Sequence, residues 1–75
     1  MAVTIKLLNK DVTESNPVSG RTCKEHVIEE GLMQDGAPED TWQVTDTNGD
    51  NIDNEPIENY DGEKIVLMPV VVKGG

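Results

Sequence analysis

The feature that most constrains this chain is an unbroken apolar run, residues 65–68, that comes shortly before its end. Such a run is typical of a strand buried at the centre of a small sheet. Pro69 has no backbone N–H to donate, so regular pairing should stop near it. The three valines that follow, residues 70–72, favour an extended backbone whether or not it is paired. We therefore expect a central strand that continues into a stiff arm ending at Gly74 and Gly75.

The arm suggests a role. From Val70 to Gly75 an extended chain spans about 20 Å, at roughly 3.3 Å per residue. Because glycine has no Cβ, Gly74 and Gly75 let a terminal carboxylate pass through a slot that is too narrow for other residues. The pattern favours a terminus that enters the active site of another protein. The alternative is a frayed end, since glycines are common in disordered termini, but that alternative leaves the preceding apolar run unexplained.

Composition limits the class of protein. With 75 residues the chain has room for one domain with a thin core, which we place at residues 1–72. There is no Phe, one Trp and one Tyr, so Ile, Val, Leu and Met must build the core around Trp42. A formal net charge of -9 argues against binding of nucleic acid or anionic membranes. An acidic surface favours either a partner with a basic groove or simple solvation.

Three features predict a soluble cytoplasmic domain, which we also expect to be a monomer. The first six residues lead directly into strand-like sequence, so we expect no signal peptide. No apolar run approaches the roughly 20 residues needed to span a bilayer. The single cysteine, Cys23, cannot form an intramolecular disulfide, which suits a reducing compartment.

The first half of the chain predicts a hairpin. Residues 2–8 alternate with a period of two, so that Val3, Ile5 and Leu7 point toward the core. Residues 9–11 form a polar turn, and residues 12–18 read as a weaker return strand.

A helix should follow the hairpin. Thr22 and Glu25 have the spacing of a capping box, and Gly31 is placed to end the helix in the left-handed conformation, with Leu32 packing back over the last turn. We expect Cys23, Val27 and Ile28 on the core side of the helix, and on the other side Lys24, Glu25, Glu29 and Glu30.

Two residues of this helix are candidates for chemistry. Cys23 is expected to be a small buried side chain, although a reactive thiol stays open because a helix N-terminus can lower a thiol pKa. His26 has no Asp or Cys partner at ligand or triad spacing, so we expect it on the solvated surface.

The second half predicts further strands. Residues 41–45 alternate, with Trp42 and Val44 inward and Gln43 and Thr45 outward, and Asn48–Gly49 is a tight-turn signal before a very short strand with Ile52 inward. Residues 46–57 are no calcium loop, because Gly49 is fourth and Ile57 stands twelfth, where a bidentate Glu is required.

The last part of the chain completes the fold prediction. Residues 56–60 place Ile57 and Tyr60 over the core from a short helical turn, and residues 61–63 turn into the final strand. We predict an α+β fold, ββαββ in chain order, with a mixed sheet of four to five strands on one helix. The first and last strands should lie parallel at its centre, because they are the most apolar.

This order of elements resembles the ubiquitin-like β-grasp family over essentially all 75 residues. Residues 36–41, Gly-Ala-Pro-Glu-Asp-Thr, are similar to the loop that follows the family's helix, and residues 57–65 to its short helical segment and entry to the last strand. Gly74-Gly75 is similar to its conjugation terminus. Residues 42–46 and the turns at 48–49 and 60–62 look most like bacterial ubiquitin-like modifiers.

The resemblance implies a substrate of an ATP-dependent activating enzyme. The Gly75 carboxylate would attack the α-phosphate of Mg-ATP, pass as a thioester to an enzyme cysteine, and be conjugated to a target lysine. The implied partners are the activating enzyme, a conjugating enzyme, a deconjugating protease and target proteins; ATP and Mg belong to the activating enzyme, and the chain itself binds no cofactor. Residues 73–75 would be a flexible tail.

Two departures from the family matter. The segment that would bind the activating enzyme is Val70, Val71, Val72 and Lys73, where eukaryotic ubiquitin is rich in arginine, so we expect a dedicated activating enzyme. Because Gln43 and Thr45 are the outward residues of their strand, the familiar aliphatic recognition patch should be absent. Five lysines are conceivable acceptors for chains, although we favour the view that they only offset the carboxylates: Lys6, Lys10, Lys24, Lys64 and Lys73.

Two other functions stay open. Sulfur carriers share this fold and the Gly-Gly end, and convert the adenylate to a thiocarboxylate. The chain could also be a non-covalent interaction module in which the glycines are incidental. We expect it not to be an enzyme, because the sequence offers no nucleophile–base pair, metal cluster or phosphate loop.

Overall fold

The computed structural model describes residues 1–32 and 38–70. Its elements confirm the predicted order ββαββ and the predicted short helical turn, which is the 3-10 helix η2, and they add a second 3-10 helix, η1. Their bounds are β1 Val3–Lys6, β2 Val12–Ser15, α1 Cys23–Glu29, η1 Glu39–Thr41, β3 Trp42–Thr45, η2 Ile57–Tyr60 and β4 Lys64–Pro69.

The two most apolar strands lie at the centre of the sheet, as predicted. The strand order is β2-β1-β4-β3, and β1 runs parallel to β4 with Ile5 opposite Ile65. The outer strands β2 and β3 pair antiparallel with their neighbours. Both central strands bury alternate side chains completely or nearly so, including Val3, Ile5, Ile65 and Leu67. Burial of one face is what fixes this register, since a slip of one residue would turn these side chains toward solvent.

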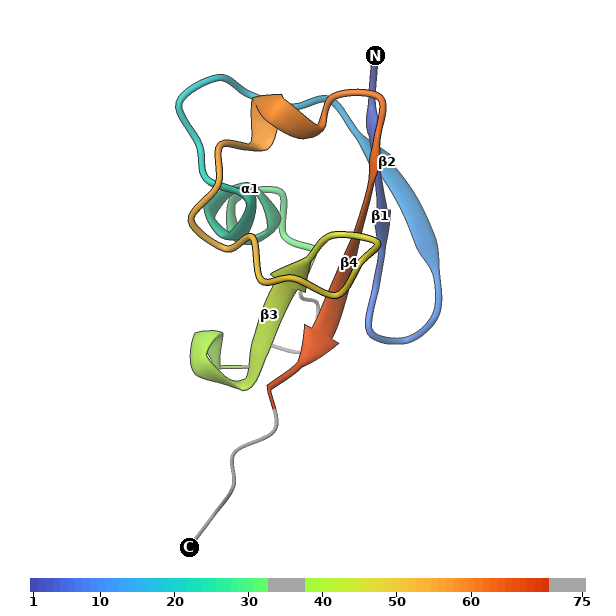
Figure 1. The fold of residues 1–75 in the computed structure, drawn as a ribbon, viewed down its shortest axis with the longest axis vertical. Helices are drawn as coiled ribbons and strands as arrows, with labels where there is room; N and C mark the ends of the chain where they lie inside the picture. The colour runs from blue at the N-terminus through green and yellow to red at the C-terminus, as the bar shows by residue number, and fades with distance from the viewer. Residues whose placement is uncertain (33–37, 71–75) are drawn as a thin grey trace, which may run out of the picture.

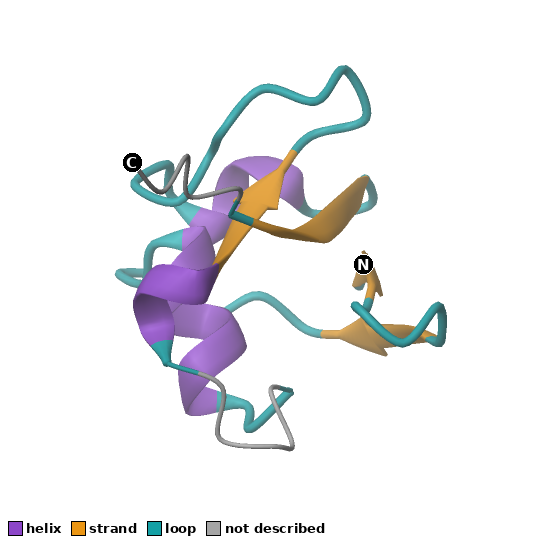
Figure 2. Cartoon of the chain, turned by 90° about the horizontal axis from the view of Figure 1, so that it is seen from below, coloured by secondary structure: helices purple, strands orange, loops and turns teal. Residues whose placement is uncertain are grey.

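One helix covers the buried face of the sheet. α1 lies on one side of the strands, with η2 beside it (Figure 1), and the view from below shows the helices together on that side (Figure 2). The remaining core comes from α1, β3 and the segment after it: Cys23, Val27, Trp42, Val44, Ile52 and Ile57. Tyr60 and Leu7 pack against this core as predicted. No helix within residues 1–32 and 38–70 is long and apolar enough to cross a membrane.

The ends of α1 form as the sequence predicts. The Thr22 side chain accepts a hydrogen bond from the Glu25 amide, and the Glu25 carboxylate accepts one from the Thr22 amide. At the other end Gly31 has φ of 66°, and the amides of Gly31 and Leu32 donate to the carbonyls of Ile28 and Val27. This pair of bonds is the Schellman arrangement, which satisfies carbonyls that the helix itself leaves free.

The prediction of a short strand around Ile52 is wrong. Ile52 is buried, but its segment pairs with β3 only through a single bridge between Thr45 and Asn51, so the sheet has four strands. The reason lies in the Val44 amide, which donates to the Asp53 side chain at 2.6 Å instead of to a strand carbonyl. β2 is also shorter than predicted and ends at Ser15.

Three further predictions of burial are wrong. The buried residues of α1 are Cys23, His26 and Val27, whereas Ile28 is 38% exposed. His26 is therefore a core-facing residue and not a solvated one. Thr45, predicted to be exposed on the outer face, is buried and donates its hydroxyl to the Val66 carbonyl at 3.2 Å.

Candidate functional site

The predicted site is the C-terminal arm, and the structure describes its first residue. Val71, Val72, Lys73, Gly74 and Gly75 lie outside the described residues.

Val70 is where the described chain leaves the sheet. Its side chain is 36% exposed, and its amide donates to the Thr41 carbonyl at 2.9 Å. Pro69 is paired with Trp42 just before it. The sheet therefore extends one bond past the proline, and the arm begins at a fixed point beside η1.

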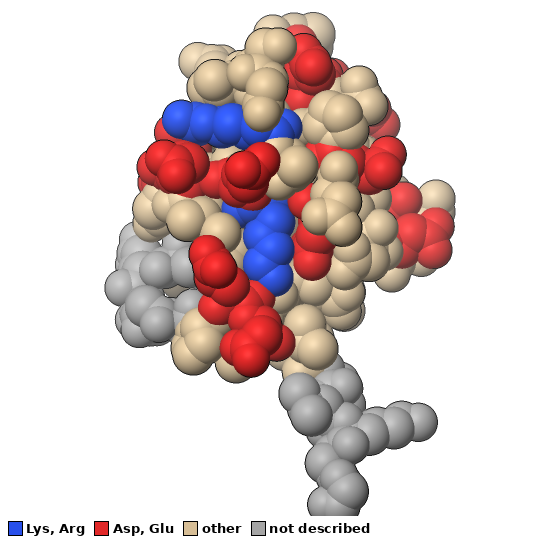
Figure 3. Space-filling view, turned by 90° about the vertical axis from the view of Figure 1, so that its left-hand side faces the viewer, with Lys and Arg blue, Asp and Glu red and all other residues tan. Residues whose placement is uncertain are grey.

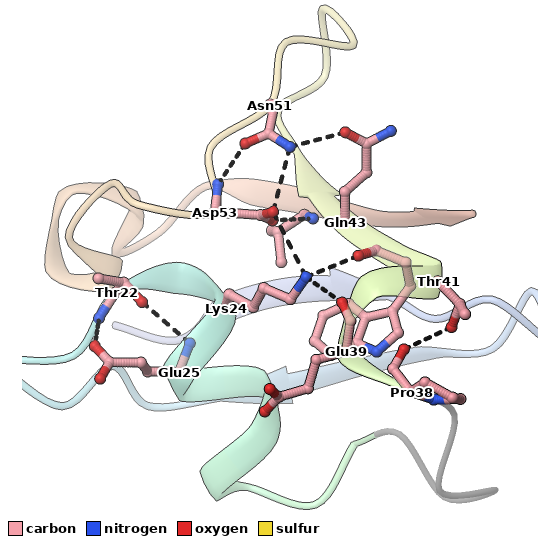
Figure 4. Close-up of polar contacts among 11 residues, drawn as sticks. Thr22, Lys24, Glu25, Pro38, Glu39, Thr41, Gln43, Asn51 and Asp53 are labelled. Carbon is pink, nitrogen blue, oxygen red and sulfur yellow. Dashed lines mark hydrogen bonds and ion pairs between the residues drawn. The ribbon is translucent and has the colours of Figure 1, made fainter. Parts of the chain in front are cut away.

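Lys24 holds η1 in place from the helix. Its ammonium group donates to the carbonyls of Glu39 and Trp42, the latter at 2.9 Å, and lies 3.7 Å from the Asp53 carboxylate (Figure 4). It also sits 4.6 Å from the centroid of the Trp42 ring, within the range of a cation–π contact. The sequence placed Lys24 on the solvent side of α1. In the structure its side chain is only 22% exposed and joins α1 to the start of β3.

The surroundings of Val70 are acidic. η1 carries Glu39 and Asp40, both exposed, immediately before the Thr41 carbonyl to which Val70 is bonded. Red side chains also cover much of the molecular face that includes α1, around a few basic ones (Figure 3). The point where the arm begins is therefore surrounded by negative charge, which is complementary to a basic surface.

The outer face of the sheet carries apolar side chains that the sequence reading missed. β3 offers only Gln43 there, because Thr45 is buried, but Met68 on β4 is 41% exposed and Val12 on β2 is 57% exposed. Met68 follows the core residue Leu67 on β4, and Val12 pairs with the outward residue Lys6 of β1. The alternation of side chains along a strand therefore predicts that both point outward. The face is therefore partly apolar even though β3 adds no aliphatic group.

Cys23 is confirmed as a buried side chain. It is fully buried at the start of α1, and burial, with the Glu55 and Asp53 carboxylates nearby, raises its pKa to about 12. The thiolate is the nucleophilic form of cysteine. The open alternative of a reactive thiol is therefore disfavoured in the folded protein.

His26 has polar partners that the sequence gave no reason to expect. Its Nε2 lies 2.8 Å from Ser15 Oγ of β2, and its Nδ1 lies 3.3 Å from an Arg21 guanidinium nitrogen. The sequence contained only weak indications of a polar cluster around His26. Ser15 faces inward on β2, and Glu30 lies one helical turn after His26.

The Ser15–His26 pair is not arranged as a nucleophile and its base. Arginine can only donate hydrogen bonds, so Nδ1 of His26 must accept and Nε2 must carry the ring proton. A general base would need Nε2 free to take the serine proton.

In the acidic turn after β3, the Asp46 carboxylate accepts hydrogen bonds from the turn itself. Asp46 Oδ1 accepts from the amides of Asn48 and Asp50 at 2.9 and 3.0 Å, and Gly49 has φ of 87°. This is the tight turn that Asn48–Gly49 predicts. Within residues 1–32 and 38–70, no three His, Cys, Asp or Glu side chains gather as metal ligands would.

Comparison with known proteins identifies the fold. No family model matches the chain, and no curated protein matches it. Among solved structures, a designed protein, dRafX6, has a TM-score of 0.70 and 25% identity over 92% of this chain and 95% of its own. A de novo protein designed on the basis of ubiquitin has a TM-score of 0.67 and 16% identity over 100% of this chain and 94% of its own. The chain has a ubiquitin-like β-grasp fold.

The β-grasp likeness confirms the fold that the sequence resemblance implied. It covers the sheet, the helix and the order of the strands. Since both neighbours are designed proteins, they carry no activity over to this chain. Function has to be argued from the arm and its surroundings.

Proposed function

We propose that this chain is a ubiquitin-like modifier whose Gly75 carboxylate is activated and joined to amines of target proteins. The observation that carries the proposal is the position of Val70. A central strand of a β-grasp sheet ends there at an exposed, backbone-anchored point, and five residues ending in Gly-Gly follow it in the sequence.

The chemistry needs an activating partner, because a carboxylate is a poor acyl donor. The Gly75 carboxylate oxygen attacks the α-phosphate of ATP and displaces pyrophosphate, which gives an acyl-adenylate. A cysteine thiolate of the activating enzyme then attacks the acyl carbon and releases AMP. A lysine amine finally displaces the thiol and forms an isopeptide bond. Metal and cationic groups of the enzyme stabilise the phosphoryl charge.

The folded domain would contribute a rigid docking surface. Lys24 and the Val70–Thr41 hydrogen bond fix η1 beside Val70, so that Glu39 and Asp40 keep a constant position relative to the point where the arm begins. Docking of this acidic corner on a basic surface would align the arm with the nucleotide. We therefore expect a dedicated activating enzyme with an apolar channel for the valines, an acidic group for Lys73, and basic residues at its mouth.

Sulfur transfer is the second candidate function. A sulfur carrier uses the same adenylate but replaces the carboxylate oxygen with sulfur to give a thiocarboxylate. The third candidate, a non-covalent module, would use the acidic face or the partly apolar sheet face and would not need Gly74 or Gly75.

Intact mass spectrometry separates the three functions. The protein is incubated with ATP, magnesium and the activating enzyme encoded beside its gene, and the same mixture is prepared with Gly75 deleted. An adduct to the enzyme that thiols remove, seen with the full chain and lost with the deletion, supports modifier or carrier. A gain of about 16 Da on the free chain with a sulfur donor, the exchange of oxygen for sulfur at the acyl carbon, selects the carrier. With no adduct, the non-covalent module is the better account.

Charge variants test the docking corner separately. Glu39→Gln with Asp40→Asn should raise the KM for this chain in the activation reaction and leave kcat near its original value, because the lost attraction acts on binding. Glu14→Gln with Glu63→Gln is the matched control, since it removes the same charge from exposed positions away from η1. Equal effects of the two pairs would show that only net charge matters.

A further inference from the structure

Four side chains from three segments form a closed ring of hydrogen bonds. Ser15 lies on β2, Arg21 in the loop before the helix, and His26 and Glu30 on α1 and its C-cap. The Arg21 nitrogen NH1 is 3.3 Å from His26 Nδ1 and 3.3 Å from Glu30 Oε2. His26 Nε2 is 2.8 Å from Ser15 Oγ, which is 3.2 Å from Glu30 Oε1.

The hydrogen-bonding groups of the ring allow only one placement of its protons. NH1 of Arg21 carries two hydrogens and has no lone pair to offer, so it donates one to Nδ1 and one to Glu30. The proton of neutral His26 must then be on Nε2, where it points at the oxygen of Ser15. The Ser15 hydroxyl donates its own hydrogen to Glu30 Oε1. Each of these donors has an acceptor, so both ring nitrogens of the fully buried His26 are hydrogen-bonded, while Glu30 closes the ring at the exposed side.

We propose that this ring is a pH-sensitive latch between β2 and α1, closed while His26 is neutral and opened when His26 takes a second proton. Protonation would put an N–H on Nδ1, directly facing an arginine donor that cannot accept it. The Arg21 contact then becomes a repulsion between two donors and two positive charges. The ring has no alternative set of protons that would keep all four contacts.

The charged groups around His26 act in opposite directions. Burial is the largest influence and lowers its pKa, and the Arg21 guanidinium lowers it further, whereas the Glu30 carboxylate raises it. β2 faces the ring with the uncharged Ser15. In turn, hydrogen bonds from Arg21 and Ser15 lower the pKa of Glu30, so this carboxylate stays ionised while the latch titrates.

The latch connects the helix to an outer strand of the sheet. β2 is an outer strand that pairs with β1 alone, so the Ser15–His26 contact is a direct tie between this strand and the helix. Because the folded-state pKa of His26 is depressed, its contribution to stability is complete above the unfolded value of about 6.5 and is lost as pH falls through the folded value. Mild acid should therefore loosen β2 first.

The single histidine of the chain makes the test direct. Two-bond proton–nitrogen NMR spectra of the labelled protein follow both ring nitrogens during a pH titration. We expect a ring protonated at Nε2 and unprotonated at Nδ1 near neutral pH, with a midpoint below about 6.5, the value for a free histidine. Amide exchange of β2 should accelerate, relative to β4, over the same pH interval. A His26 midpoint at or above that value would overturn the proposal. So would amide exchange of β2 that does not change, relative to β4, over the pH interval in which His26 titrates.

Two variants should move the midpoint in opposite directions. Arg21→Met removes a positive charge and the donor to Nδ1, so the midpoint should rise. Glu30→Gln removes the carboxylate that favours the charged ring, so the midpoint should fall. Glu29→Gln is the control, because it removes the same charge from the neighbouring exposed position, outside the ring. If Glu29→Gln shifts the midpoint as much as Glu30→Gln, the ring is not what sets it.

A non-titrating replacement separates the latch from the carboxylates. In His26→Gln the side-chain amide can still donate to Ser15 but cannot be protonated in this range. The urea concentration at the unfolding midpoint should decrease more for the natural protein than for the variant when the pH is lowered from 7 to 5. Parallel profiles would refute the latch, and the titration of the natural protein remains decisive should the variant fold poorly.

Discussion

Replacement of Lys24 by methionine should destabilise this small domain severely. The ammonium group donates to two backbone carbonyls, pairs with Asp53 at 3.7 Å and lies over the Trp42 ring at 4.6 Å. A hydrogen bond to a charged group contributes about 1.5–3 kcal/mol, and methionine can make neither the exposed bond to the Glu39 carbonyl nor the partly buried bond to the Trp42 carbonyl. Methionine keeps much of the apolar stem that covers the indole. Since Lys24 retains 22% exposure, water can replace part of the loss, and we expect about 2–3 kcal/mol.

The assay uses the only tryptophan of the chain as its probe. Trp42 is buried beside Lys24, so its fluorescence reports unfolding in urea as well as local change at the variant site. For a domain of this size, 1 kcal/mol corresponds to about 4–8 °C in Tm, so Lys24→Met should lower Tm by about 10–20 °C.

The matched control is Lys64→Met. Lys64 is exposed on β4, and surface replacements of this kind change stability by less than about 0.5 kcal/mol. Asp53→Asn keeps an oxygen for the Val44 amide but removes the charge facing Lys24, and should cost about 1 kcal/mol or less. If Lys24→Met matched Lys64→Met, the contacts of Lys24 would contribute nothing net and the reasoning would be refuted.

Three further predictions concern α1. Thr22→Ala should cost about 0.5–2 kcal/mol in urea unfolding, because it removes the acceptor for the Glu25 amide; no loss would mean that water caps the helix equally well. Gly31→Ala should cost about 1 kcal/mol, since a Cβ has free space there but φ of 66° is strained for alanine; a neutral result would show that this turn can change conformation. Cys23, with a pKa of about 12, should react with a thiol reagent at pH 8 much more slowly in the folded chain than in urea, and equal rates would contradict its burial.

Much of the candidate site came from resemblance and not from residue patterns. The pattern of residues 65–69 predicted a central strand that stops at a proline, and the structure confirms the strand. The role of Gly74 and Gly75 was implied by similarity to the ubiquitin-like family, and it stays a prediction. The acidic corner of Glu39 and Asp40 was not foreseen, because their place beside Val70 depends on a hydrogen bond between residues 29 positions apart in the chain.

Local signals determined the elements. The alternation of Val3 and Ile5, the capping box at Thr22 and the glycine at position 31 each act within a few residues, so the sequence alone predicted the strand, the helix and its ends. The parallel pairing of β1 and β4 was also readable, because only these strands are apolar enough for the centre of the sheet.

The tertiary structure decided which side of the short helix faces the core. A seven-residue helix with Cys23 and Val27 inward can turn either His26 or Ile28 toward the sheet, and hydrophobicity favours Ile28. The helix is instead placed so that His26 meets Ser15 and Arg21, while Lys24 on its other flank meets β3 and η1. The buried polar side chains His26 and Thr45 are hydrogen-bonded to partners from distant segments, whereas the buried Trp42 Nε1 has no partner among the described residues. The pattern of apolar residues along one helix does not show which distant residues will hydrogen-bond to it. Those partners come together only in the folded structure.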